Sequence, residues 1–89
     1  LYLKDCDDNR FVNFSSNYNL EDGIYILGSD SNLFEGFDSI NNSYSGFNIR
    51  SLSSDNNFSN VNASLNGDNG VNIDSSDSNY FYDSFFEVP

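Results

Sequence analysis

The tetrapeptide Gly46-Phe47-Asn48-Ile49 decides the fold, because its pattern of Gly, apolar residue, any residue and Ile occurs three times. The other copies are Gly23-Ile24-Tyr25-Ile26 and Gly70-Val71-Asn72-Ile73, so the glycines are 23 and 24 residues apart. Leu1-Tyr2-Leu3 fits the same frame one period earlier. A fixed period of this length indicates a repeat architecture in which each copy forms one structural unit.

A second signature, Asn, any residue and Phe, lies downstream of each copy of the first. It occurs at residues 9–11, 32–34, 56–58 and 79–81. The extra residue of the longer period lies before the third of these, near Leu52. Apolar residues at positions i and i+2 share one face of a strand, and no segment shows a sustained helical period. One copy of about 23 residues cannot bury its apolar stripe alone, whereas stacked copies bury it continuously.

We therefore predict an all-β chain folded as a right-handed parallel β-helix, in which each turn is one repeat. The whole of 1–89 forms one segment of about four coils of 23–24 residues, with the boundaries 1–22, 23–45, 46–69 and 70–89. Equivalent residues stack about 4.8 Å apart in such a fold, so identical side chains form ladders. The predicted ladders are Leu3, Ile26, Ile49 and Ile73; Leu1, Ile24, Phe47 and Val71; and Phe11, Phe34, Phe58 and Phe81.

The run of Gly-Ile-x-Ile, a small polar residue and Asn-x-Phe resembles the parallel β-helix repeats of pectate-lyase-like folds, along the whole chain. Those repeats recur in carbohydrate-binding and sugar-hydrolase domains and in many microbial surface proteins. The resemblance implies the fold and makes polysaccharide a possible partner. Because many activities share this scaffold, it does not imply a particular function.

The repeated small and polar residues are interpreted as parts of the scaffold. Asn tolerates left-handed backbone, and stacked amides bond along a ladder, so we expect the Asn of the second signature to occupy a tight turn. The glycines of the first signature are expected to mark a sharp corner at strand entry. Cys6 shares its slot with Ser29 and Ser76, and a small residue recurring there predicts a buried, inert thiol.

Acidic residues gather in the turn after the first strand of each copy, and Asp7, Asp30 and Asp77 share one register. Stacked carboxylates repel one another, and a hard cation such as Ca²⁺ would relieve that repulsion. Asp7 and Asp30 are therefore candidate metal ligands, and Ca²⁺ is the ion that we expect them to bind. The alternative is a solvated acidic edge that keeps the solenoid soluble.

Catalysis has little support in the sequence. The chain contains no His and only three basic residues, and no two acidic residues that share a register in the second half of the repeat lie in adjacent coils. We predict that the chain is not an enzyme and has no catalytic residue. The candidate ligand-binding residues are Tyr2 and Tyr25, which take the outward slot between buried strand residues. Aromatic faces flanked by Asn and Asp suit sugar rings.

The charge balance excludes two classes of partner. Lys and Arg total 3 against 14 acidic residues, which gives a formal net charge of −11. A chain this acidic does not follow a phosphate backbone or dock on anionic lipid. No apolar run approaches the roughly 20 residues of a membrane span. We predict no nucleic-acid partner and no membrane insertion.

The leading hypothesis is a segment of an extracellular or cell-surface, non-enzymatic β-helix with a structural, adhesion or filament-forming role. The alternative is a fragment of a polysaccharide-active lyase, hydrolase or epimerase whose catalytic coils lie elsewhere. A third possibility is amyloid-like stacking. The repeat of 23 or 24 residues argues against it, because steric zippers need no such repeat. Open strand edges template further pairing, so we expect flanking coils or end-to-end copies of the chain to cover them, and no free monomer.

Overall fold

A computed structural model describes residues 1–86, and all the regular secondary structure in that range is β. The strands are β1 (Tyr2–Lys4), β2 (Arg10–Ser15), β3 (Ile24–Leu27), β4 (Leu33–Asp38), β5 (Phe47–Arg50), β6 (Asn57–Ala63), β7 (Val71–Asp74), β8 (Tyr80–Tyr82) and β9 (Phe85–Phe86). The predicted fourth coil, 70–89, ends on Glu87, Val88 and Pro89, which lie outside the described residues. Over residues 1–86 there is no helix that could cross a membrane.

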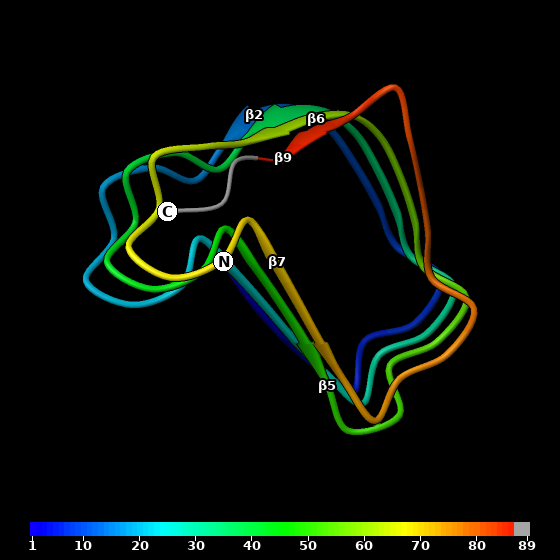
Figure 1. Ribbon diagram of the computed structural model, residues 1–89. Coiled ribbons are helices and arrows are strands. Elements are labelled where there is room, and N and C mark those ends of the chain that lie inside the picture. The colour runs from blue at the N-terminus through cyan, green and yellow to red at the C-terminus, as the bar shows by residue number, and fades with distance from the viewer. Residues whose placement is uncertain (87–89) are drawn as a thin grey trace.

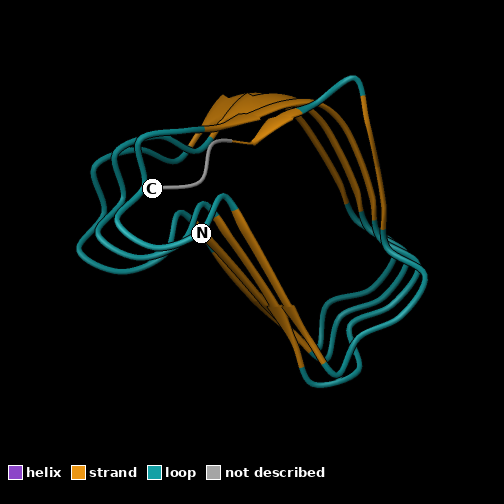
Figure 2. Ribbon diagram, viewed as in Figure 1, coloured by secondary structure: helices purple, strands orange, loops and turns teal. Residues whose placement is uncertain are grey.

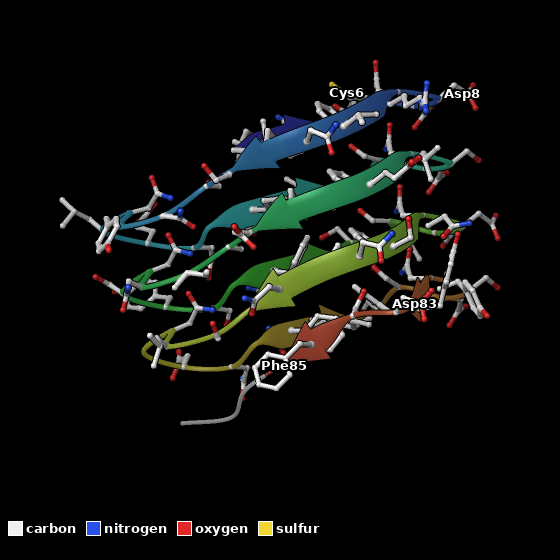
Figure 3. The ribbon with its side chains drawn as sticks, turned by 90° about the horizontal axis from the view of Figure 1, so that it is seen from above. Cys6, Asp8, Asp83 and Phe85 are labelled. Carbon is white, nitrogen blue, oxygen red and sulfur yellow. The ribbon has the colours of Figure 1, made fainter. Side chains whose placement is uncertain are left out.

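The strands form two parallel sheets in which each strand pairs with its equivalent one period later. One sheet has the order β1-β3-β5-β7, and the other has β2-β4-β6-β8 with β9 paired to β6. The register joins Leu3 to Ile26, Ile26 to Ile49 and Ile49 to Ile73, as the repeat predicts. The chain runs counter-clockwise in Figure 1 as it advances from the blue coil at the back to the red coil at the front, an order that Figure 3 also shows. The coil is therefore right-handed, and the predicted four-coil parallel β-solenoid is confirmed.

A bend within β2, β4 and β6 gives each coil its third side (Figure 2). Asn13, Gly36 and Asn60 stand at the bend with φ of 52°, 66° and 51°, and the strand pairing skips all three. In the last coil Asp83, at φ 49°, divides the strand into β8 and β9. The residues after this left-handed position thus form the third side of each coil, which is β9 in the last one.

Stacked apolar columns fill the interior. Adjacent rings of the column Phe11, Phe34, Phe58 and Phe81 lie 4.9, 4.8 and 4.3 Å apart, with interplanar angles of 12°, 9° and 8°. The aliphatic columns pack opposite this aromatic stack, and Phe47 meets Phe58 edge-on at 5.2 Å. The strand registers confirm the Leu3 and Phe11 ladders in full, and the remaining ladder from Ile24 through Phe47 to Val71; Leu1 lies before β1 and outside the paired residues.

The left-handed turn residues differ from the sequence prediction by one position. The Asn residues of the second signature do not have positive φ; the residues before them, Asp8, Ser31, Asp55 and Ser78, do, at 58°, 57°, 56° and 57°. Asn in this slot is therefore explained by its hydrogen bonds and not by left-handed backbone.

The glycines of the first signature also serve a different purpose from the predicted corner. A Cβ at Gly46 would lie 2.7 Å from the Gly70 carbonyl oxygen and 2.8 Å from the Ala63 Cβ. Neither Gly23 nor Gly46 has positive φ, so the missing side chain is needed because neighbouring coils approach closely. The extra residue of the longer period lies in the turn at Ser51 and Leu52, both left-handed, and Leu52 points outward with 76% of its surface exposed.

Candidate functional site

The most regular polar feature is the column formed by the Asn residues of the second signature, which are buried in the two middle coils, half-buried in the last coil and exposed in the first. The backbone N–H groups of Asn9, Asn32 and Asn56 donate to the Oδ1 atom of the Asn one coil later, at 2.8, 2.9 and 3.0 Å. In the three later coils the Nδ2 atoms donate back to carbonyl oxygens of the preceding coil, such as Asn56 to Ser29 at 2.9 Å. The column, named here the first Asn ladder, therefore joins all four coils, as the sequence predicts.

The structure contains a second Asn ladder, which was not predicted from the sequence. It consists of Asn19, Asn42 and Asn66, on the side of the coil that follows the bend. The N–H groups of Asn19 and Asn42 donate to the next Oδ1 atom at 3.0 and 2.9 Å. Each of these three residues lies four positions before a glycine of the first signature. This constant spacing could have predicted the ladder from the sequence.

A third column repeats the same pattern with small side chains. Cys6, Ser29 and Ser53 donate their N–H groups to Ser29, Ser53 and Ser76 Oγ, each at 3.1 Å. In all three columns, the earlier coil supplies the N–H donor and the later coil supplies the side-chain acceptor. The stack consequently has a direction, and its two ends differ chemically.

The expected burial of Cys6 is wrong. Ser29 and Ser53 in the same column are fully buried, but Cys6 is exposed because no described coil precedes the first one. Figure 3 shows Cys6 on the first coil, at the edge of the stack. Its Sγ lies 3.1 Å from the Lys4 carbonyl oxygen, the same kind of contact that Ser29 Oγ makes with Leu27. The sequence identified the slot correctly and the exposure incorrectly.

Asp7 and Asp30 lie in adjacent coils on the turn after the first strand. Asp7 Oδ1 accepts the Asp30 N–H at 2.8 Å, and Asp30 Oδ1 accepts the Ser54 N–H at 2.7 Å. One oxygen of each carboxylate is therefore used in backbone bonding between coils. Residues 1–86 contain no group of three or more His, Cys, Asp or Glu side chains placed to hold a metal ion. Binding of Ca²⁺ at Asp7 and Asp30 stays a prediction.

Tyr2 and Tyr25 form a stacked pair on the outer face of the first sheet. Their ring centroids are 5.3 Å apart with an interplanar angle of 20°. Beside them is an open groove of about 830 Å³, lined also by Leu1, Asn19, Leu20, Glu21 and Asp22. Burial lowers the pKa of the Leu1 amino group, which donates to the Gly23 carbonyl oxygen at 2.8 Å. The groove combines aromatic faces with acidic and amide groups, and ligand binding at Tyr2 and Tyr25 stays a prediction.

The basic side chains are distributed along the coils and do not gather at one place. Arg50 bonds Asp74 of the next coil at 3.0 Å, and this contact raises the pKa of the Arg50 guanidinium above its usual value. Arg10 lies 3.6 Å from Glu35 of the next coil, with the Arg10 side chain exposed and the Glu35 side chain half-buried. Lys4 shares a column with Arg50 two coils later, as the repeat predicts.

The two ends of the stack expose side chains that are buried in the middle coils. Ile73 is 44% exposed, whereas Ile49 in the same column is fully buried. Phe11 and Phe81, the outermost members of the aromatic stack, are only partly buried. Phe86 covers part of the C-terminal end, because it packs edge-on against Phe81 at 5.2 Å and 85°. The principal extents are 28 × 23 × 18 Å.

No protein-family model, curated protein or solved structure matches this chain. The arguments for its function therefore rest on its own residues.

Proposed function

We propose that the chain is a non-enzymatic, structural segment of an extracellular or cell-surface protein. The observation that carries the proposal is the use made of its repeated polar side chains. Asn32, Asn42 and Asn56 are buried, and each bonds both to the coil before it and to the coil after it. Side chains committed in this way stiffen the stack and are not available to a substrate.

The outer surface supports the same proposal. The net charge of −11 is spread over the turns, and acidic residues next to the sheets keep an exposed β structure soluble. Asn, Ser and Asp dominate the outward positions, while Lys and Arg number only 3. This composition suits a secreted or surface-attached solenoid with a structural or adhesive role.

A finer assignment to the pectate-lyase-like type of solenoid is supported by the Gly-apolar-x-Ile and Asn-x-Phe pattern alone. The alternative, that the chain is a fragment of a polysaccharide-active enzyme, is supported by the same resemblance. No catalytic arrangement within residues 1–86 adds to that support. Polysaccharide binding is a second candidate function, because the Tyr2 and Tyr25 stack borders a groove that contains Glu21 and Asp22. Stacked tyrosines offer flat faces to sugar rings, and carboxylates accept hydrogen bonds from hydroxyls.

The structural function is tested by locating the protein on the cells that produce it. An antibody raised against residues 1–89 is applied to intact and to permeabilised cells, and the purified chain is incubated with neutral and uronic-acid polysaccharides. We expect labelling of intact cells and no new reducing ends. Labelling only after permeabilisation, or cleavage of any polysaccharide by the chain, would contradict the proposal.

The second candidate is tested by titrating neutral and acidic oligosaccharides into the chain and into two variants. Tyr2→Ala should abolish the heat of binding, because it removes half of the aromatic stack beside the groove. Tyr18→Ala is the control, since Tyr18 is 77% exposed and does not line the groove. Equal loss in both variants, or no heat with the unmodified chain, would count against sugar binding there.

A further inference from the structure

We propose that the exposed face of the last described coil binds the exposed face of the first coil of a second copy, so that the coil stack continues from copy to copy. This inference rests on the structural function proposed above and identifies its partner as the chain itself. It assigns the register of the contact: the first coil of the second copy occupies the place that a fifth coil would take. Because stacking in register moves each copy along the coil axis, this head-to-tail contact does not close into a ring and builds a filament.

The direction of the polar ladders is the first argument. At the C-terminal end, the Asn79 N–H is the next donor in the first Asn ladder, because each earlier Asn donates to the coil that follows. At the N-terminal end, Asn9 Oδ1 is the acceptor that begins the same ladder. A second copy in register places this acceptor above that donor, as between Asn56 and Asn79 at 3.0 Å.

The small-residue column gives the same register independently. Ser76 at the C-terminal end would donate its N–H to the side chain of Cys6 in the second copy. Within the chain, Ser53 makes the equivalent contact with Ser76 at 3.1 Å. Cys6 already has the orientation of this column, because its Sγ contacts the Lys4 carbonyl oxygen as Ser29 Oγ contacts that of Leu27.

Charge complementarity along one column is a further argument. Lys4, Leu27, Arg50 and Asp74 occupy successive coils in a single register. A second copy would set its Lys4 directly above Asp74, so that the carboxylate lies between two cations. Asp74 already bonds Arg50 on its other side at 3.0 Å.

Other arrangements of two copies lose these contacts. Two C-terminal ends brought face to face would leave the ladder N–H donors of both faces without side-chain acceptors and Asp74 without a cation from the second copy. Two N-terminal ends would leave the ladder acceptors of both faces without N–H donors and Lys4 without a carboxylate from Asp74. Polar groups left without partners weaken an interface. The head-to-tail contact alone satisfies the ladders and the charges together.

Apolar burial supplies the remaining driving force. Phe11 of the second copy would extend the aromatic stack beyond Phe81, where rings within the chain are already 4.3 to 4.9 Å apart. Leu3 would cover Ile73, which is 44% exposed at the end of its column. Removal of apolar surface from water favours association.

Cysteine cross-linking tests the register directly. Ser76→Cys places a new thiol one coil below Cys6 of the next copy, at a Cα separation of about 4.8 Å, which a disulfide can span. The slot tolerates Cys, since Cys6 occupies it in the first coil. Because each variant chain then carries a thiol at both ends, mild oxidation should yield a series of multimers with Cys6 joined to residue 76. The unmodified chain has one Cys, so oxidation can link it covalently into nothing larger than a disulfide-bonded dimer.

Tyr82→Cys is the matched control, because Tyr82 is exposed in the same coil but lies in the column of Val12, away from Cys6. Oxidised Tyr82→Cys should give few multimers. Equal multimer formation by both variants, or only dimers from a folded Ser76→Cys chain, would overturn the inference.

If circular dichroism shows that Ser76→Cys does not fold, the variant Lys4→Glu is used to test the register of the contact. The exposed Lys4 side chain makes no ion pair in the described structure, so its reversal should leave the fold intact. Sedimentation should show association about tenfold weaker, since an attraction across the contact becomes a repulsion. Unchanged association would refute the register. Either failure would leave surface labelling unaffected, so it is distinguishable from failure of the proposed structural function.

Discussion

Replacing Asn56 by Ala tests whether the first Asn ladder holds the coils together. Asn56 is fully buried in the middle of the ladder. Its Oδ1 accepts the Asn32 N–H at 2.9 Å and the Asn32 Nδ2 at 3.1 Å. Its Nδ2 donates to the Ser29 carbonyl oxygen at 2.9 Å and to Asn79 Oδ1 at 3.0 Å. Alanine removes all four hydrogen bonds, and its methyl group cannot form replacements.

The cost follows from the partners that are left without a bond. The Asn32 N–H and the Ser29 carbonyl are buried, and each buried polar group without a partner costs about 1–3 kcal/mol. Asn56→Ala should therefore lower the free energy of unfolding by about 3–5 kcal/mol, some of it from the small cavity left behind. A chain of this size has a total stability of about 4–13 kcal/mol, so the variant should be marginal or unfolded.

The matched control is Asn57→Ala in the same strand. Asn57 is exposed, and its side chain makes no hydrogen bond in the described part of the chain. Its replacement should change the free energy of unfolding by less than about 0.5 kcal/mol. Both variants are unfolded with urea at one fixed protein concentration and followed by far-ultraviolet circular dichroism. Equal stability of the two variants would show that the ladder does not stabilise the coils.

The interior, the bend and the acidic turn each give a further prediction. Phe58→Ala should cost about 3–5 kcal/mol in a urea titration, because Phe58 is fully buried between two stacked rings, whereas Phe85→Ala, at a residue 57% exposed, should cost less than about 1 kcal/mol. Gly36→Ala should lower the thermal midpoint by about 4–8 °C or more, since φ is 66° and a Cβ would lie 2.8 Å from a side-chain oxygen of the preceding coil; an unchanged midpoint would show that the bend has no left-handed requirement. Titration with Ca²⁺ should release or absorb heat that disappears in the double variant Asp7→Asn, Asp30→Asn; the absence of heat, together with a midpoint unaffected by chelator, would exclude the site.

The spacing of residues along the chain was enough to predict the architecture. Gly23, Gly46 and Gly70 revealed the period, and alternation around them identified the strands and the buried columns. Stacking in register followed, because only copies placed above one another bury such a stripe. In a repeat of this kind the sequence period is the structural period, so the columns could be read directly from residue numbers.

Details that depend on the backbone of a single turn could not be predicted in the same way. The left-handed residue of the tight turn is Ser31 and not Asn32, since the period does not show which of two adjacent polar residues takes positive φ. Cys6 is exposed although its column is buried, because burial in a solenoid depends on the coil above as well as on the slot. The second Asn ladder was overlooked because Asn66 and its equivalents lie in loops without apolar alternation.

Sedimentation velocity of the 89-residue chain, measured together with circular dichroism over a range of micromolar concentrations, tests the central claim most directly. A stack that continues from copy to copy predicts a β-rich protein whose sedimenting mass exceeds 10.0 kDa and grows with concentration. A stable, folded species of 10.0 kDa throughout that range would contradict it.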